Sequence, residues 1–185
     1  MSENIILKKT LPKKVKIRIK SGEILIYPTD TGYGIGCNAL KSSSIELVKK
    51  ISGTKDNTNI SVIAPSKEWI YKNFKIKNKN YIKKLPGPFT FVLETKKRTL
   101  ARNLSPGNKK IKVKMPDHRF YNMVKTIGIP ILNIELRNKL NIVNPDHIPR
   151  KIKRKSDMII NDGYIRKSPS ATINISKEIP SIIGG

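Results

Sequence analysis

The chain is organised around ILIYPTDTGYGIG, residues 24–36. Its first four residues are an apolar run of strand-forming types, and we expect Pro28 to end this run because proline cannot donate to a sheet ladder. After Pro28 come two threonines, an aspartate and three glycines. Glycine lets a backbone approach a ligand closely, and hydroxyl groups offer hydrogen bonds. The stretch therefore predicts a buried strand and a ligand-binding loop, with a strand and a plain tight turn as the alternative.

Length and charge limit what this loop could serve. The 185 residues, 37% of them hydrophobic, are enough for one sizeable core, so a single domain over residues 1–185 is predicted. Lys and Arg number 38 against 13 Asp and Glu, a net charge of 38 − 13 = +25. Such an excess favours RNA, DNA or nucleotide phosphates as partners through counterion release. The alternative is a lysine-rich surface that is merely solvated.

Cysteine and histidine usage excludes several kinds of site. Cys37 is the single cysteine, which excludes an intramolecular disulfide and predicts a reducing, cytoplasmic location. His118 and His147 are the only histidines, and their spacing suggests no metal site. No apolar stretch approaches the roughly 20 residues that span a bilayer, and the first four residues open no signal-peptide pattern, so no membrane partner is expected.

Strand and helix patterns alternate along the chain. Alternating apolar and basic residues over 15–20 predict a half-exposed strand. Apolar spacing over 45–51 predicts a helix with residues 42–44 as possible caps, and Ser66 is expected to cap another. A helix is also predicted from residue 116 to Gly128. Strands alternating with helices predict an α/β fold with a twisted, mixed sheet, the remaining strands being residues 60–64, 89–93, 111–115, 129–136, 158–160 and 172–175.

Four motifs together resemble the YrdC-like family. Residues 28–34, PTDTGYG, resemble its strand-end loop, and residues 86–90, PGPFT, resemble its second signature. Residues 113–118, VKMPDH, resemble its Arg-x-Pro segment, and residues 169–173, PSATI, its Pro-Ser-Thr element. The order and spacing of the motifs make the resemblance specific, and it covers nearly the whole chain.

The resemblance implies an open α/β sheet with flanking helices and a concave, basic cavity, and it places a helix over residues 15–20. It implies that L-threonine, bicarbonate and ATP give threonylcarbamoyl-AMP and pyrophosphate, for threonylcarbamoyladenosine modification of tRNA. The implied partners are RNA or tRNA and the downstream tRNA threonylcarbamoyl-transfer machinery. Mg²⁺ is expected to accompany ATP, held largely by phosphate oxygens.

Several positions depart from the family motifs. The Lys-x-Arg motif falls on residues 52–54, Ser-Gly-Thr, so two phosphate-facing cations are replaced, with Lys49, Lys50 or Lys55 as possible substitutes. The Ser-x-Asn motif falls on residues 135–137, Glu-Leu-Arg. Lys114 stands where the family has arginine, which keeps a charge but loses the planar fork. The last four residues lack the arginine usually seen there.

The resemblance also supplies candidate site residues, although it assigns no catalytic residue. It implies threonine binding by Thr31, Tyr33 and Lys114. It implies ATP binding by Thr54, Lys55, Thr90, Arg137 and Ser170.

Three functions remain open. The first is a divergent synthase in which Lys55, Lys114 and Arg137 take over the phosphate contacts. The second is a catalytically impaired relative that binds double-stranded RNA or tRNA through its basic surface. The third is a carbamoyl-transfer domain acting on another donor, which the short chain disfavours. We favour the first because Thr31 and Thr90 are hard to explain as purely structural.

Overall fold

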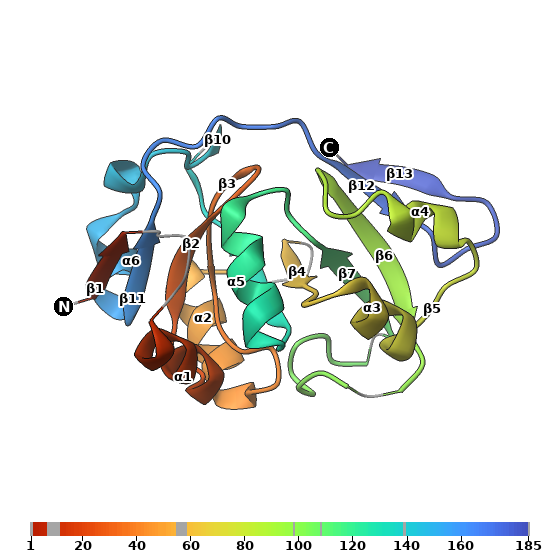
Figure 1. Cartoon of the computed structure of the whole chain (residues 1–185), viewed down its shortest axis with the longest axis horizontal. Helices are drawn as coiled ribbons and strands as arrows, with labels where there is room; N and C mark the ends of the chain where they lie inside the picture. Colours follow the sequence, from red (N-terminus) through yellow and green to blue (C-terminus); the bar gives the residue numbers. More distant parts are fainter. Residues whose placement is uncertain are drawn as a thin grey trace.

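The computed structural model describes residues 2–6, 12–54, 59–97, 99–107, 109–138 and 140–184. In this part of the chain an open, twisted, mixed sheet of eleven strands has the order β1-β11-β2-β3-β8-β4-β7-β6-β12-β13, with β5 beside β6 (Figure 1). β9 (Arg137–Asn138) and β10 (Leu140–Asn141) form a separate two-stranded sheet. The strands of the large sheet are β1 (Glu3–Ile6), β2 (Leu25–Thr29), β3 (Gly32–Gly36), β4 (Ile60–Ile63), β5 (Phe74–Lys75), β6 (Phe89–Thr95), β7 (Lys110–Lys114), β8 (Ile131–Glu135), β11 (Met158–Asn161), β12 (Ala171–Asn174) and β13 (Ser181–Gly184).

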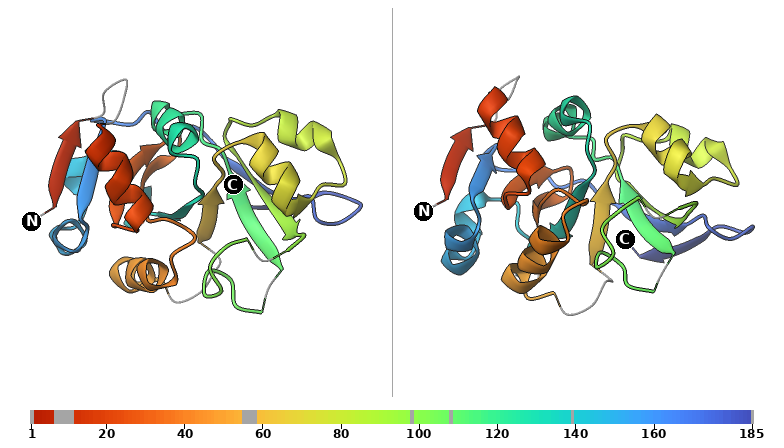
Figure 2. Two further views of the ribbon diagram at one scale, coloured as in Figure 1. Left: turned by 60° about the horizontal axis from the view of Figure 1, so that its bottom comes forward. Right: turned by 90° about the horizontal axis from the view of Figure 1, so that it is seen from below.

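Helices flank the sheet on both faces, with α3 and α5 on one side and α2 and α6 on the other (Figure 2). The rings of Tyr27 and Phe120 stack at 4.5 Å between centroids, which joins α5 to β2 in the core. None of the helices in the described ranges is long and apolar enough to cross a bilayer. The helices are α1 (Lys13–Ser21), α2 (Ser42–Ser52), α3 (Lys67–Asn73), α4 (Lys79–Lys83), α5 (Arg119–Ile127) and α6 (Arg150–Lys155), with a 3₁₀ turn, η1 (Pro145–His147).

The glycine-rich stretch forms a hairpin rather than an open loop. β2 continues through Pro28, which pairs with Tyr33 of β3, so the prediction that Pro28 ends the strand was wrong. On its other side β2 pairs with β11 only at Leu25 and Ile26. The missing N–H of Pro28 therefore removes no bond from that ladder.

Two glycines of β3 are required by close packing against β8. A Cβ at Gly36 would lie 1.7 Å from the carbonyl oxygen of Leu132. A Cβ at Gly34 would lie 2.6 Å from Oδ1 of Asn133. Gly36 therefore lets the backbones of β3 and β8 approach closely, and Gly34 leaves room for the side chain of Asn133.

Two local predictions near the amino terminus were wrong. Residues 15–20 belong to helix α1, as the resemblance implied, because Val15 and Ile19 on one face are buried while Ile17 is 58% exposed. Helix α2 begins at Ser42 itself, and the residue before it, Lys41, forms no side-chain capping hydrogen bond. By contrast, Oγ of Ser66 accepts a hydrogen bond from the Trp69 N–H, so the predicted cap of α3 is confirmed.

The strands predicted beyond residue 60 are confirmed as β4, β6, β7, β8, β11 and β12. Helix α6, of six residues, and strands β1 and β13, of four residues each, were missed, since segments this short carry little periodicity. Residues 162–170 run along the top of Figure 1 from β11 to β12. The N–H of Ser168 donates to the carbonyl of Asp30 at 2.9 Å, which fastens this segment to the turn between β2 and β3.

Candidate functional site

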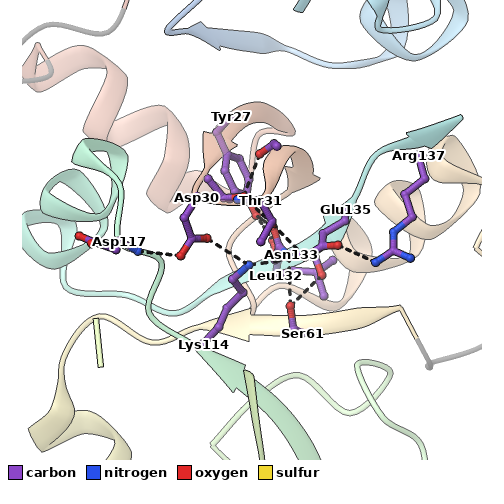
Figure 3. A network of polar contacts seen from close by, with 12 residues as sticks. Tyr27, Asp30, Thr31, Ser61, Lys114, Asp117, Leu132, Asn133, Glu135 and Arg137 are labelled. Carbon is purple, nitrogen blue, oxygen red and sulfur yellow. Dashed lines mark hydrogen bonds and ion pairs between the residues drawn. The ribbon is translucent and has the colours of Figure 1, made fainter. Parts of the chain in front are cut away.

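Five polar side chains meet where the β2–β3 turn approaches the ends of two other strands (Figure 3). Lys114 ends β7, Glu135 ends β8, and Arg137 begins β9. We call the group the Lys114 cluster, and its members are Asp30, Thr31, Lys114, Glu135 and Arg137.

Lys114 lies between two carboxylates. Its Nζ is 3.7 Å from Oδ1 of Asp30 and 3.5 Å from Oε1 of Glu135. The side chains of Lys114 and Asp30 are only 4% and 3% exposed, and that of Glu135 is 19% exposed. Removing such charges from water is costly unless they are paired, so each carboxylate offsets the burial of the ammonium.

Glu135 is the centre of the contacts. Oγ1 of Thr31 donates to its Oε1 at 3.2 Å, although the two residues are 104 positions apart in the sequence. Nη2 of Arg137 donates to its Oε2 at 2.8 Å. One carboxylate thus contacts a hydroxyl, an ammonium and a guanidinium that the sequence analysis had assigned to substrate binding.

The two carboxylates differ in acidity. Burial opposes ionisation of Glu135, but the charges of Lys114 and Arg137 and the Thr31 hydrogen bond outweigh it and hold its pKa below the ordinary value. Burial raises the pKa of Asp30 above its ordinary value, against the opposing effect of Lys114. The N–H of Asp117 donates to Oδ2 of Asp30 at 3.0 Å, while the buried Oδ1 has no hydrogen-bond partner among the described residues.

A buried layer of hydrogen bonds supports the cluster from β8. Oδ1 of Asn133 accepts from the hydroxyl of Tyr27 at 2.9 Å, and its Nδ2 donates to Oγ of Ser61 at 3.1 Å. Sequence reasoning did not select Asn133 or Asp30 as site residues. Asp30 could have been found, because an aspartate between two threonines at a strand end suggests a polar site; nothing local marks Asn133.

Two small cavities adjoin the cluster, and both are lined by Glu135 and Arg137. The larger, of about 300 Å³, also contacts Thr54, and the smaller, of about 80 Å³, also contacts Thr90. Thr90 pairs with Lys114 across β6 and β7. The structure therefore brings Thr31, Thr54, Thr90, Lys114 and Arg137 into one region. Arg137 and Glu135 balance each other in the larger cavity, and the expected basic lining stays a prediction.

Two other predicted residues, Tyr33 and Ser170, lie outside this cluster. The hydroxyl of Tyr33 donates to the carbonyl of Gly163 at 2.8 Å and accepts from the Asp162 N–H at 3.0 Å, and burial raises its pKa to about 12. Ser170 lies directly before β12 and lines neither cavity. Lys55 lies outside the described residues.

The positions of the replaced Lys-x-Arg motif hold no cation at the cluster. Oγ of Ser52 and Oγ1 of Thr54 lie 3.0 Å apart and form a hydrogen bond. Nζ of Lys49, a suggested substitute, donates to the carbonyl of Asn103 at 2.7 Å and so points elsewhere. Among the described residues no group of three or more His, Cys, Asp and Glu could hold a metal ion.

In its sequence, the chain is similar to one protein family and to several individual proteins. A family model named Sua5_yciO_yrdC and described as "Telomere recombination" matches residues 18–183. An uncharacterized protein of Haemophilus influenzae is 24% identical over 173 residues, which cover 89% of this chain and 84% of that protein. A putative threonylcarbamoyl-AMP synthase of Methanocaldococcus jannaschii is 27% identical over 165 residues, covering 86% of this chain and 77% of that protein.

Solved structures share the fold. Escherichia coli YciO superposes with a TM-score of 0.86 at 21% identity, covering 100% of this chain and 95% of that one. Sua5 of P. abyssi in complex with L-threonine superposes with a TM-score of 0.82 at 21% identity, covering 98% of this chain. The match spans 56% of the Sua5 chain, so this chain corresponds to little more than half of it.

Proposed function

The chain belongs to the Sua5/YciO/YrdC family, and we propose that it is a threonylcarbamoyl-AMP synthase. In this reaction the amine of L-threonine and bicarbonate form a carbamate with loss of water. A carbamate oxygen then attacks the α-phosphorus of ATP, and pyrophosphate leaves. The product would pass to the tRNA threonylcarbamoyl-transfer machinery, which fits a cytoplasmic location.

One observation carries the proposal: Thr31, Lys114 and Arg137, from three separate segments, contact one carboxylate beside two cavities. A hydroxyl and an ammonium suit the carboxylate of an amino acid. A guanidinium at the cavity edge suits phosphate oxygens. The reaction needs its reactants oriented and the phosphate charge stabilised, and both requirements are met by fixed donors in a partly buried site.

We assign roles accordingly. Thr31 and Lys114 bind the threonine carboxylate, and Tyr33 keeps the hairpin and the Asp162–Gly163 turn in place around it. ATP is bound by Arg137, with the hydroxyls of Thr54 and Thr90 at the two cavities. Lys55 and Ser170 complete this set when the nucleotide is present.

Mg²⁺ fits as a companion of ATP and not as a resident ion. The carboxylates of the cluster are Asp30 and Glu135, and both are paired with cations. Mg²⁺ commonly takes one or two protein carboxylates and otherwise phosphate oxygens and water. When bound with ATP, it would neutralise charge on the phosphates.

The test is incubation with ATP, bicarbonate and labelled threonine, followed by chromatography for threonylcarbamoyl-AMP and pyrophosphate. Arg137→Ala should weaken ATP binding by roughly tenfold or more, since hydrogen bonds to a charged partner contribute about 1.5–3 kcal/mol. Lys110→Ala, at the far end of β7, is the matched control. The proposal would be refuted if the protein formed no product and bound neither threonine nor ATP.

A second candidate function is RNA binding, favoured by helix α6. Five of its six residues are cations, namely Arg150, Lys151, Lys153, Arg154 and Lys155, and Ile152 of the same helix lines the larger cavity. RNA affinity should then fall steeply with salt, with a slope of about −0.7 to −0.9 per phosphate contacted. Replacing the three α6 lysines by glutamine should reduce that slope, whereas an unchanged slope would remove α6 from the interface.

A further inference from the structure

Glu135 stands where the groups proposed for two different substrates meet. Its Oε1 accepts from Thr31 at 3.2 Å and lies 3.5 Å from Nζ of Lys114, the pair assigned to the amino acid. Its Oε2 accepts from Arg137 at 2.8 Å, the residue assigned to the nucleotide. In the family motif this position is a serine, which has no charge to offer either group.

A carboxylate here competes with the ligands. The carboxylate of threonine is the same chemical group as that of Glu135. The Lys114 ammonium is buried, so water cannot replace Glu135 as its partner. The lowered pKa of Glu135 keeps it ionised at neutral pH. Threonine must therefore break the contacts of Oε1 before Thr31 and Lys114 can bind it, and ATP must break the contact of Oε2 before Arg137 can bind it.

From this geometry, and resting on the proposed function, we propose that Glu135 couples the two substrates, so that binding of either one raises the affinity for the other. Threonine takes Thr31 and Lys114 away from Oε1, and the ATP phosphates take Arg137 away from Oε2. Once one set of contacts is lost, the remaining set holds the side chain less firmly and the second ligand displaces it more easily. By linkage, the effect is the same in both directions.

The surroundings allow this displacement. Glu135 and Arg137 both line the two cavities of about 300 and 80 Å³, and the Arg137 side chain is 57% exposed. Glu135 can therefore turn into open space without moving the core. Asp30 stays 3.7 Å from Lys114, so the ammonium keeps one carboxylate throughout the exchange.

The experiment is calorimetric titration with threonine, with and without an ATP analogue whose α,β-bridging oxygen is replaced by methylene. Bicarbonate is left out so that no chemistry occurs. For the wild-type protein we expect the analogue to tighten threonine binding about tenfold. Glu135→Gln should bind threonine more tightly on its own and show almost no effect of the analogue.

Glu94→Gln is the matched control. This substitution also removes a carboxylate from an ion pair, the one with Lys75 at the other end of β6, and it should leave the coupling unchanged. If Glu135→Gln unfolds at a lower temperature and cannot be titrated, Glu135→Ser restores the family residue and carries the same expectation. The wild-type comparison needs no variant at all.

The outcomes separate this inference from the proposed function. Wild-type protein that binds both ligands without coupling overturns the inference and leaves the function intact. Wild-type protein that binds neither ligand, while Glu135→Ser binds both, overturns the inference, because Glu135 then blocks the site instead of coupling the two ligands. Absence of binding in the wild-type protein and in both Glu135 variants overturns the inference together with the function.

Discussion

The two ends of the β6–β7 pair hold their charges in different ways. At one end, where Thr90 pairs with Lys114, the cluster sets two carboxylates against two cations. The other end lies four residues, or about 14 Å, away along the strands, where Glu94 of β6 is opposite Lys110 of β7 in the strand register. A cavity of about 480 Å³ lies beside it. We call this cavity the distal pocket, and its lining includes Glu94 and the cations Lys75, Lys96, Lys97, Arg102 and Lys109.

The difference teaches where a strongly basic chain keeps its excess charge. Buried charges must be matched because desolvation is costly, so the cluster is nearly balanced. Exposed charges are screened by water and salt, so the distal pocket tolerates five cations against one acid. The net charge of +25 therefore says little about the position of the site. Four predictions would break or sharpen this contrast.

The largest effect is expected from removing the buried cation. Lys114→Met leaves Asp30 and Glu135 without their shared partner and should lower the free energy of unfolding by about 3–5 kcal/mol. Lys109→Met in the distal pocket should change it by less than about 0.5 kcal/mol. Urea denaturation of both variants measures the difference. Equal, small effects would mean that the cluster is hydrated and the contrast is wrong.

The next effect depends on pH and concerns His118, whose side chain is 13% exposed. Its Nδ1 accepts the Phe120 N–H at 3.1 Å, so the proton of the neutral ring lies on Nε2, 3.1 Å from Oδ2 of Asp162. Burial lowers the pKa of His118 to about 4. Between pH 6.5 and pH 4 the unfolded chain binds a proton at His118 that the folded protein does not bind. The free energy of unfolding should therefore fall by up to about 3 kcal/mol as the pH drops from 6.5 towards 4.

His118→Asn isolates this contribution, since asparagine still caps helix α5 but does not titrate. The variant should show a flatter stability profile between pH 6.5 and 4, measured by urea denaturation at each pH. An unchanged profile would assign the acid sensitivity to other groups.

A smaller effect is expected at two threonines, Thr31 in the Lys114 cluster and Thr99 in the distal pocket. Thr31→Val should weaken threonine binding by about 1–3 kcal/mol while the fold survives, because the hydroxyl that donates to Glu135, and that we propose binds the threonine carboxylate, is removed. Thr99→Val in the distal pocket should cost no stability, because its Oγ1 is buried without a hydrogen-bond partner in the described part of the chain. Calorimetry and thermal unfolding test the pair. Unchanged threonine affinity in Thr31→Val would remove this residue from the binding site.

The smallest effect is expected at the Lys75–Glu94 ion pair, with Nζ 2.7 Å from Oε1 and both side chains reaching solvent. Glu94→Gln should leave the thermal midpoint almost unchanged at low salt, and any loss should vanish at about 0.5 M salt because the pair is screened. A clear loss that persists in salt would show that the distal pocket is also a matched, desolvated site.

The sequence by itself determined the order of many of the helices and strands. Apolar runs bounded by turn residues located β4, β6, β7, β8, β11 and β12, and Ser66 and Gly128 marked helix ends where the structure has them. These signals are local: a cap or a buried run depends on residues only a few positions apart. The family motifs added that this mixed sheet is open and drew attention to Thr31, Thr90 and Lys114.

Only the tertiary structure decided what is not local. The alternation over residues 15–20 fits a strand by pattern, yet packing of Val15 and Ile19 against the core makes it a helix. The hydroxyl of Tyr33 meets the turn at Gly163, 130 residues away. Glu135 looked like the loss of a neutral hydrogen-bonding group, and it became the partner of Thr31, Lys114 and Arg137 only because the sheet brings β3, β8, β4 and β7 side by side. Pairing of buried charges is set by distance and desolvation in three dimensions, and neither can be read from the spacing of residues along the chain.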